Sequence, residues 1–247
     1  MSDQRSWILG LHAVKAALKQ NLALSELLVD AGRRDNRIRE VMTLAEAAGV
    51  KCRKLPGRAL DEEVGETGHQ GVALRLRQQQ AQDEPYLKAL LKRLDEAPLL
   101  LVLDGVQDPH NLGACLRTAD AAGVDALIIP RDRSAGLTAT VRKVASGAAE
   151  TVPLIQVTNL SRTLKWLKSE GVWLIGTAGE AQQTLYETDL KGPLALVMGG
   201  EEKGLRRLTR EQCDLLVKLP MAGSVESLNV SVAAGVSLYE AVRQRRI

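Results

Sequence analysis

The feature that most constrains the fold is a series of short, continuous apolar runs in the C-terminal two thirds of the chain. Each run has the length of a buried strand, and patterns with helical periodicity separate most of them. A strand that is apolar throughout must be covered on both faces, as in a parallel sheet between two layers of helices. The runs are Leu99–Leu103, Ala126–Pro130, Val152–Val157, Val172–Gly176, Leu194–Met198 and Leu215–Leu219. The sequence therefore predicts an α/β domain with a parallel sheet, whose ligands bind beyond the carboxyl ends of the strands.

The N-terminal part has shorter apolar runs that alternate with helical patterns, which indicates a small α/β module. The runs are Leu27–Val29 and Val72–Leu76, and the helical patterns cover Ala13–Leu18 and Ile38–Ala48. A polar stretch over residues 77–85 lacks periodicity and ends in a proline, which is typical of a linker. We therefore expect a small domain at 1–79, a linker at 80–95 and a larger domain at 96–247.

The net charge of +3 is concentrated in the N-terminal part. Residues 1–79 contain 13 Lys and Arg against 10 Asp and Glu, whereas residues 80–247 contain 20 of each kind. The basic clusters are Arg33, Arg34, Arg37 and Arg39, then Lys51, Arg53 and Lys54, then Arg75 and Arg77. They could neutralise RNA phosphates or simply form a solvated surface. Because Phe is absent and aromatic residues make up only 2% of the chain, charge and shape should dominate any RNA binding.

Several classes of protein are not indicated. No stretch approaches the ~20 apolar residues that cross a bilayer, and no apolar segment follows the polar residues Met1 to Ser6. The three cysteines, Cys52, Cys115 and Cys213, are scattered without the spacing of a disulfide framework or a zinc site. We expect a soluble cytoplasmic protein that needs no metal and does not bind membranes.

The first group of residues with chemical potential follows the run Leu99–Leu103. The segment from Asp104 to Arg117 reads DGVQDPHNLGACLR, and Leu112, Cys115, Leu116 and Ala119 form an apolar stripe at helical spacing. Arg117 falls off this stripe and should project elsewhere. On spacing alone, Asn111 is a helix cap or a functional amide, and Arg117 is a surface charge or a functional cation.

The second group follows the run Leu194–Met198. The segment from Gly199 to Leu205 reads GGEEKGL, and glycines directly after a buried strand let backbone amides approach a ligand closely. The pattern matches neither a dinucleotide fingerprint nor a phosphate-binding loop, so a nucleoside triphosphate site is not indicated. A plain turn between strand and helix fits the pattern equally well.

The third group lies between Leu219 and Ser231 and leads into a helix at the end of the chain. Ser227 is placed to cap this helix. Leu228, Val232, Val236, Tyr239 and Val242 form an apolar stripe along this helix.

Three blocks in these groups resemble, in order and spacing, the motifs of the SPOUT class of RNA methyltransferases, in its SpoU/TrmH branch that modifies the ribose 2′-oxygen. The blocks are DPHNLGACLR from Asp108 to Arg117, LVMGGE from Leu196 to Glu201, and SLNVS from Ser227 to Ser231. Two N-terminal segments, Gly10 to Val14 and His69 to Val72, resemble the small substrate-binding domain of the bacterial 23S rRNA (guanosine-2′-O-)-methyltransferases.

The resemblance implies a C-terminal SPOUT domain with a deep trefoil knot, an exception to the rule that chains are not knotted. It implies that S-adenosylmethionine binds in the knot against Gly199, Leu219 and Leu228, with Met221 nearby. It also implies a homodimer with the active site near the dimer interface, and 23S rRNA rather than DNA as the partner.

The resemblance further implies roles for the polar motif residues. Arg117 would contact the ribose 2′-oxygen and an adjacent phosphate, and stabilise negative charge as it develops. Asn111, Glu201, Ser227 and Asn229 would position Arg117, the ribose and the cofactor. Arginine has also been proposed as a base in this class, but free guanidinium normally stays protonated. We interpret His110, His12 and His69 as structural.

Two other functions remain open at this point. The same reaction could act on transfer RNA, although the small N-terminal domain argues against it because the transfer-RNA relatives carry basic extensions instead. The chain could also be a non-catalytic RNA-binding or ribosome-assembly protein, but such a protein would be expected to lose polar motif residues that are present here.

Overall fold

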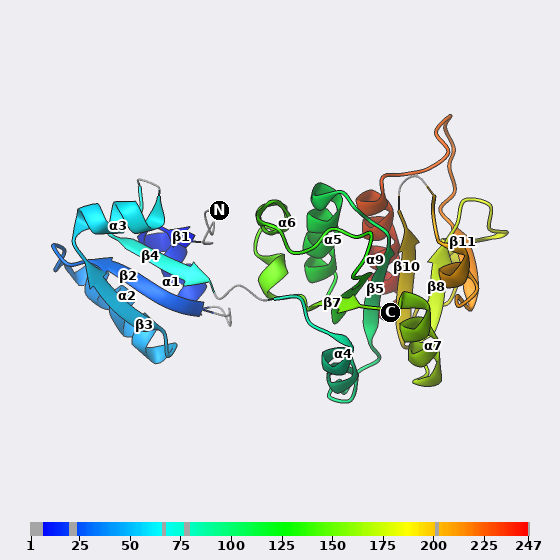
Figure 1. The fold of residues 1–247 in the computed structure, drawn as a ribbon, viewed down its shortest axis with the longest axis horizontal. Coiled ribbons are helices and arrows are strands. Elements are labelled where there is room, and N and C mark those ends of the chain that lie inside the picture. Colours follow the sequence, from blue (N-terminus) through cyan, green and yellow to red (C-terminus); the bar gives the residue numbers. More distant parts are fainter. Residues whose placement is uncertain (1–6, 20–23, 66–67, 77–79, 201–202, 247) are drawn as a thin grey trace. The chain divides into compact units, whose positions relative to one another are not determined.

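The computed structural model describes residues 7–19, 24–65, 68–76, 80–200 and 203–246. The chain divides into two compact units, Met1–Gln79 and Gln80–Ile247. The ribbon in Figure 1 shows each unit as a sheet with helices against it. Each unit is described by itself below.

The first unit contains a four-stranded mixed sheet in the order β1-β4-β2-β3. Strand β2 pairs antiparallel with β4 and parallel with β3, and β1 pairs antiparallel with β4. The elements are β1 (Trp7–Leu9), α1 (Leu11–Lys19), β2 (Leu24–Asp30), α2 (Asn36–Ala47), β3 (Lys51–Leu55), α3 (Gly57–Val64) and β4 (Val72–Leu76).

Alternation along the strands decides which helices cover which face of this sheet. Leu27 and Val29 of β2 pack in one cluster with the buried residues of α1 and α2. Leu28, which lies between them, packs in another cluster with Leu60 of α3. Helices α1 and α2 therefore cover one face, and α3 covers the other.

The second unit contains a seven-stranded sheet in the order β7-β6-β5-β10-β8-β11-β9, and all its described pairings are parallel. Its strands are β5 (Leu99–Asp104), β6 (Ala126–Pro130), β7 (Leu154–Val157), β8 (Trp173–Thr177), β9 (Gln183–Thr184), β10 (Leu194–Gly199) and β11 (Leu215–Lys218). In the centre, Gly199 of β10 lies opposite Asp104 of β5. The carboxyl ends of the strands meet at one edge, where the sequence predicted the site.

Helices cover both faces of this sheet, as the apolar strands require. The core on one face joins β5 with α5 (Pro109–Ala121), α6 (Ala139–Ala145) and α9 (Val230–Arg245). The core on the other face joins it with α4 (Glu84–Leu91) and α7 (Leu160–Ser169). Two 3-10 turns, Ala148–Glu150 and Leu185–Glu187, and the short helix α8 (Arg207–Arg210) complete the unit.

The predicted fold class is confirmed, and all six predicted strands are present with ends that differ by at most two residues. The knot is not tested by these observations and stays a prediction. Residues 80–95 differ from the expected linker because they contain α4. Asp83 caps α4, and Leu87 is fully buried against the sheet, so this segment is part of the second unit.

The apolar stripe predicted on the last helix lies mostly off its buried face, although Val242 packs against the core. Val232 and Tyr239 are 51% and 53% exposed, and Leu228 lies before the helix begins. The buried face uses Ala234, Leu238 and Ala241 instead. Small residues on that face allow α9 to approach α5 closely, and periodicity alone does not show which of two apolar faces is buried. No helix in the described ranges is long and apolar enough to span a bilayer.

Candidate active site

A cavity of about 310 Å³ opens at the edge of the sheet where β8, β10 and β11 end. Thr177, Gly199 and Lys218, which line it, are the last residues of these three strands. The loops that follow the strands supply the remaining walls, together with the first turn of α9. The lining residues outside the strands are Ala178, Gly179, Glu180, Gly200, Lys203, Gly204, Leu205, Arg210, Leu219, Met221, Glu226, Ser227, Leu228, Val230 and Ala233.

The loop after β10 folds back closely on its own strand. A Cβ atom added at Gly199 would lie only 2.0 Å from the carbonyl carbon of Gly204. A Cβ atom at Gly200 would lie 2.7 Å from the carbonyl oxygen of Gly105, in the loop after β5. Both glycines are therefore required by close backbone approach, and bare backbone forms this side of the cavity.

A buried carboxylate fixes the far end of the same loop. Asp104, at the end of β5, is only 1% exposed and accepts a hydrogen bond from the backbone N–H of Arg206 at 2.9 Å. The Arg206 guanidinium also donates to Asp104 through Nε and forms an ion pair with it. This contact joins residues 102 positions apart and attaches the loop to the centre of the sheet.

A side-chain contact also joins α5 to the start of α9. Asn229 caps α9 by accepting a hydrogen bond from the Ser231 N–H at 2.9 Å, and its Nδ2 donates to Oδ1 of Asn111 at 3.0 Å. Asp108 caps α5 by accepting from the His110 N–H. Ser227 is therefore not the cap of the last helix, and Asn111 is not the cap of α5, as spacing alone had allowed. Two of the predicted catalytic residues, Asn111 and Asn229, are therefore joined by a hydrogen bond between their side chains.

The other predicted catalytic residues occupy different surroundings. Ser227 is exposed and lines the cavity. Arg117 is exposed on α5, as its position off the buried stripe predicted, but it is not one of the cavity's lining residues. Thr118, the next residue, faces Gly235 of α9, so Arg117 lies near the contact between these helices. Glu201 lies outside the described residues.

All four residues predicted to bind the cofactor, Gly199, Leu219, Met221 and Leu228, line the cavity. The loop from Thr177 to Glu180 lines the cavity as well, although the motifs of the sequence did not point to it. A glycine shortly after the predicted strand Val172–Gly176 was a signal that could have found it. In this loop, a hydrogen bond from Arg210 holds the pKa of Glu180 below its usual range.

Cys213 and Cys115 both lie in the second unit, in surroundings that differ in burial. Burial raises the pKa of Cys213 to about 12, so its thiol stays protonated at neutral pH and is a poor nucleophile. Cys115 is fully buried in the predicted stripe. Across the described residues, no group of three or more His, Cys, Asp or Glu side chains could hold a metal ion.

Two family models match the chain in order. Residues 7–82 match the model for RNA 2′-O ribose methyltransferase substrate binding, and residues 98–239 match the SpoU rRNA Methylase family. Among curated proteins, the 23S rRNA (guanosine-2′-O-)-methyltransferase RlmB of Shewanella oneidensis is 56% identical over 240 residues, covering 97% of each chain. RlmB of Pseudomonas putida is 55% identical over 246 residues, covering 99% of each.

Solved structures agree with these matches. The SpoU methyltransferase AviRb from Streptomyces viridochromogenes, in complex with the cofactor AdoMet, has a TM-score of 0.72 and 25% identity, covering 98% of this chain and 91% of that one. A TrmH/SpoU tRNA modifying enzyme from A. aeolicus has a TM-score of 0.57 and 33% identity, covering 66% of this chain and 84% of that one. The strand-end cavity, the predicted motifs and these similarities agree: the chain belongs to the SpoU rRNA methylase family.

Proposed function

We propose that this protein transfers a methyl group from S-adenosylmethionine to the ribose 2′-oxygen of a guanosine in 23S rRNA. The observation that carries this proposal is the similarity to curated RlmB proteins at 55–56% identity over 97–99% of both chains. The similarity includes the small domain as well as the methylase domain, so it covers the parts that would bind RNA and cofactor. A cytoplasmic location fits such a substrate.

The cavity at the strand ends suits S-adenosylmethionine. Its volume of about 310 Å³ lies within the range typical of small-molecule sites. Leu219, Met221 and Leu228 supply apolar contacts for the adenine ring, and the backbone at Gly199 can approach the ribose. Lys218 can contact a carboxylate, whereas Arg210 and Glu180, which also line the cavity, form an ion pair with each other.

For this reaction the protein mainly has to position the reacting groups and stabilise the charge that develops on the 2′-oxygen. When bound, S-adenosylmethionine supplies an activated methyl group on its sulfonium sulfur. The protein must hold the ribose hydroxyl in line with that methyl group and favour loss of the hydroxyl proton. We assign to Arg117 the stabilisation of negative charge on the 2′-oxygen through its planar donors. Asn111, Ser227, Asn229 and Glu201 are assigned to positioning.

A homodimer would explain the exposed face of α9. Val232, Val236 and Tyr239 recur at helical spacing, and Val232 and Tyr239 are more than half exposed. Apolar stripes of this kind mark interaction surfaces. Because Thr118 and Gly235 face each other, a second copy seated on this stripe would lie near Arg117. We propose that dimerisation completes the surroundings of Arg117, which stands outside the cavity of its own chain.

Neither alternative function is favoured by a specific observation. The TrmH/SpoU tRNA modifying enzyme covers 66% of this chain, whereas the RlmB proteins cover nearly all of it. A non-catalytic protein of this fold would need neither the hydrogen bond between Asn111 and Asn229 nor the cavity at the strand ends.

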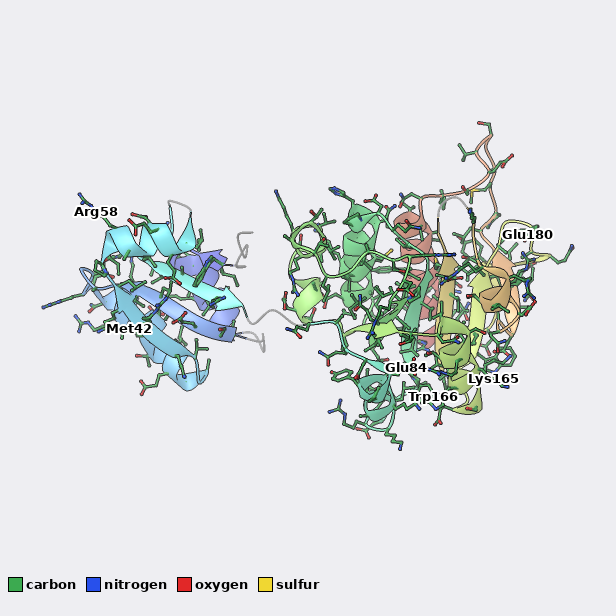
Figure 2. The ribbon with its side chains drawn as sticks, viewed as in Figure 1. Met42, Arg58, Glu84, Lys165, Trp166 and Glu180 are labelled. Carbon is green, nitrogen blue, oxygen red and sulfur yellow. The ribbon has the colours of Figure 1, made fainter. Side chains whose placement is uncertain are left out.

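The test is transfer of labelled methyl from S-adenosylmethionine to separate pools of 23S rRNA, 16S rRNA and total transfer RNA. The wild type should label 23S rRNA, and Arg117→Ala should reduce the rate by at least about 100-fold, the scale of losing a transition-state charge contact. Lys165→Ala, which removes a charge from the exposed face of α7 (Figure 2), is the matched control and should leave the rate unchanged. Label on transfer RNA alone would contradict the proposal.

A further inference from the structure

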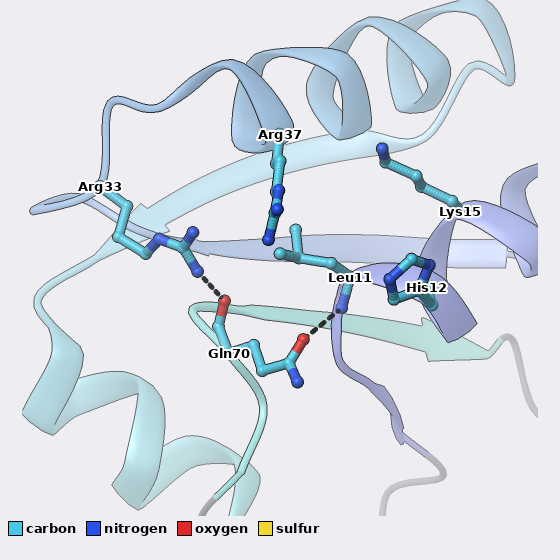
Figure 3. A pocket seen from close by; sticks show the side chains of 6 residues that line it. All are labelled: Leu11, His12, Lys15, Arg33, Arg37 and Gln70. Atoms are coloured by element: carbon cyan, nitrogen blue, oxygen red, sulfur yellow. Dashed lines mark hydrogen bonds between the residues drawn. The ribbon is translucent and has the colours of Figure 1, made fainter.

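The first unit contains a second pocket. The role inferred for it below rests on the proposed function. The pocket has a volume of about 410 Å³ and lies between α1, α2 and the turn before β4 (Figure 3). Its lining residues are Leu11, His12, Lys15, Arg33, Arg37 and Gln70. Three of the six, Lys15, Arg33 and Arg37, are cationic. None of the six is acidic, and His12 alone among them carries a ring.

The turn that forms the pocket floor is held in a strained conformation. Gln70 has a φ of 51°, which is uncommon for a residue other than glycine. His69, 8% exposed, holds the turn from behind: its Nδ1 accepts from the Gly71 N–H at 3.0 Å and its Nε2 contacts Asp61 at 2.8 Å. Such strain persists where the surroundings enforce it, and it is concentrated at binding and catalytic sites.

The same turn orients two side chains of the pocket. Oε1 of Gln70 accepts a hydrogen bond from the Leu11 N–H at 3.3 Å, and the Gln70 carbonyl accepts from Arg33, as Figure 3 shows. A Cβ atom at Gly71 would lie 2.6 Å from Cδ of Arg33, so this glycine makes room for the arginine. Asp35 accepts from Nε and Nη2 of Arg33 on the other side, at 2.9 and 2.7 Å. Arg33 is therefore fixed before any ligand arrives.

The remaining cations differ in how far they are neutralised. Lys15 forms an ion pair with Glu40, which lowers the pKa of that carboxyl group. Arg37 is exposed, and the structure gives its side chain no ion pair or hydrogen bond with any described residue. His12, on α1, also lines the pocket. Positive charge thus remains available where Arg37 and Lys15 face the pocket from neighbouring helices.

We propose that this pocket binds backbone phosphate of the RNA substrate, with Arg37 and Lys15 as the principal contacts and Gln70 and His12 as polar neighbours. A fixed guanidinium, further cations and no carboxylate in the lining suit an anion. Apart from the imidazole of His12, the lining offers no ring on which a base could stack. Because phosphate contacts orient RNA without reading its sequence, the pocket would position the RNA rather than choose the guanosine.

The test measures binding of the full-length protein to a 23S rRNA fragment by fluorescence anisotropy over a series of salt concentrations. Arg37→Ala should weaken binding by about tenfold near 0.1 M salt and reduce the slope of log K against log salt by about 0.7 to 0.9, the value for one phosphate contact. Lys15→Ala should have a smaller effect because Glu40 already shares its charge. Arg37→Lys should retain most of the binding.

The matched control is Arg58→Ala. Arg58 is an exposed arginine on α3, which covers the opposite face of the same sheet, and Figure 2 shows it extending away from the unit. The substitution Arg58→Ala removes the same charge from the same domain, but on the face away from the pocket. It should therefore leave the RNA affinity and the salt slope close to those of the wild type. Thermal melting should show that all the variants are folded.

Two results separate this proposal from the proposed function. If Arg37→Ala and Arg58→Ala bind RNA equally well, the pocket proposal is wrong, even when the wild type methylates 23S rRNA. If the wild type transfers no methyl group to 23S rRNA but Arg37→Ala still loses RNA affinity and salt slope relative to Arg58→Ala, the pocket proposal stands and the proposed function fails. A loss of S-adenosylmethionine binding in Arg37→Ala that equals its loss of RNA binding would contradict the pocket proposal.

Discussion

The cavities of the two units are lined by different kinds of chemical group. In the second unit, strand ends and closely packed glycines form the cavity, and bare backbone makes one of its walls. In the first unit, charged side chains of α1, α2 and the segment before α2 surround the pocket, and backbone conformation shapes it at one strained turn. A site made of backbone should respond sharply to added atoms and little to salt. A site made of charges should respond gradually to each charge and strongly to salt.

The largest effect is expected from Gly199→Ala. The new methyl group would meet the backbone of Gly204 at 2.0 Å, a contact that only movement of the loop can relieve. We expect affinity for S-adenosylmethionine to fall by more than about 100-fold, as overpacking of a well-packed site costs up to ~3 kcal/mol. Isothermal titration calorimetry measures it. Gly192→Ala is the control, because nothing lies within 4 Å of its Cβ position. Equal affinities for both variants would show that backbone packing does not shape this site.

The next effect is expected from Arg206→Met, which leaves the buried carboxylate of Asp104 without its guanidinium partner. A hydrogen bond to a charged group contributes about 1.5–3 kcal/mol, so the free energy of unfolding should fall by that amount. Arg207→Met is the neighbouring control, since Arg207 pairs with Glu211 on the exposed surface and should contribute less than about 1 kcal/mol. Denaturant titration compares them. A smaller loss in Arg206→Met than in Arg207→Met would contradict the role given to Asp104.

A smaller effect is expected from Asn229→Ala, which removes the cap of α9 and the hydrogen bond to Asn111. Loss of such a cap costs about 1 kcal/mol of stability. Asn111→Ala removes the shared hydrogen bond but leaves the cap of α9 in place, so it should destabilise the protein less. Thermal melting gives the order of stability. If methyl transfer falls in both variants beyond what their stability explains, the pair also positions the reacting groups.

The smallest effect is expected in the affinity for S-adenosylmethionine when the salt concentration is raised. Raising salt from about 50 to 200 mM should weaken RNA binding by orders of magnitude, because counterions compete for the phosphates. Cofactor binding should change by less than about twofold, since packing and backbone contacts dominate its site. Anisotropy and calorimetry on one preparation give both values. If salt weakened the binding of RNA and of S-adenosylmethionine equally, the two sites would not differ in the way described.

The sequence predicted much of the second unit because its strands are apolar throughout and follow one another at regular spacing. It also located the strand-end loops, since a parallel sheet brings carboxyl ends together. It did not reveal that Asp104 would bind Arg206, because that contact joins residues 102 positions apart. It did not show which face of α9 is buried, because both faces are apolar and the close approach to α5 decides between them. In the first unit, charge clustering left phosphate binding and a solvated surface equally open, and it could not show which cations face a pocket.

The central claim is that the methyl group is placed on the ribose of a guanosine in 23S rRNA, and the product identifies the atom directly. We would incubate the protein with labelled S-adenosylmethionine and 23S rRNA, hydrolyse the RNA with alkali and separate the products. A 2′-O-methyl group blocks cleavage at its own nucleotide, so the account predicts label in an alkali-resistant dinucleotide that contains 2′-O-methylguanosine. Label released as a single nucleotide with a methylated base would contradict it.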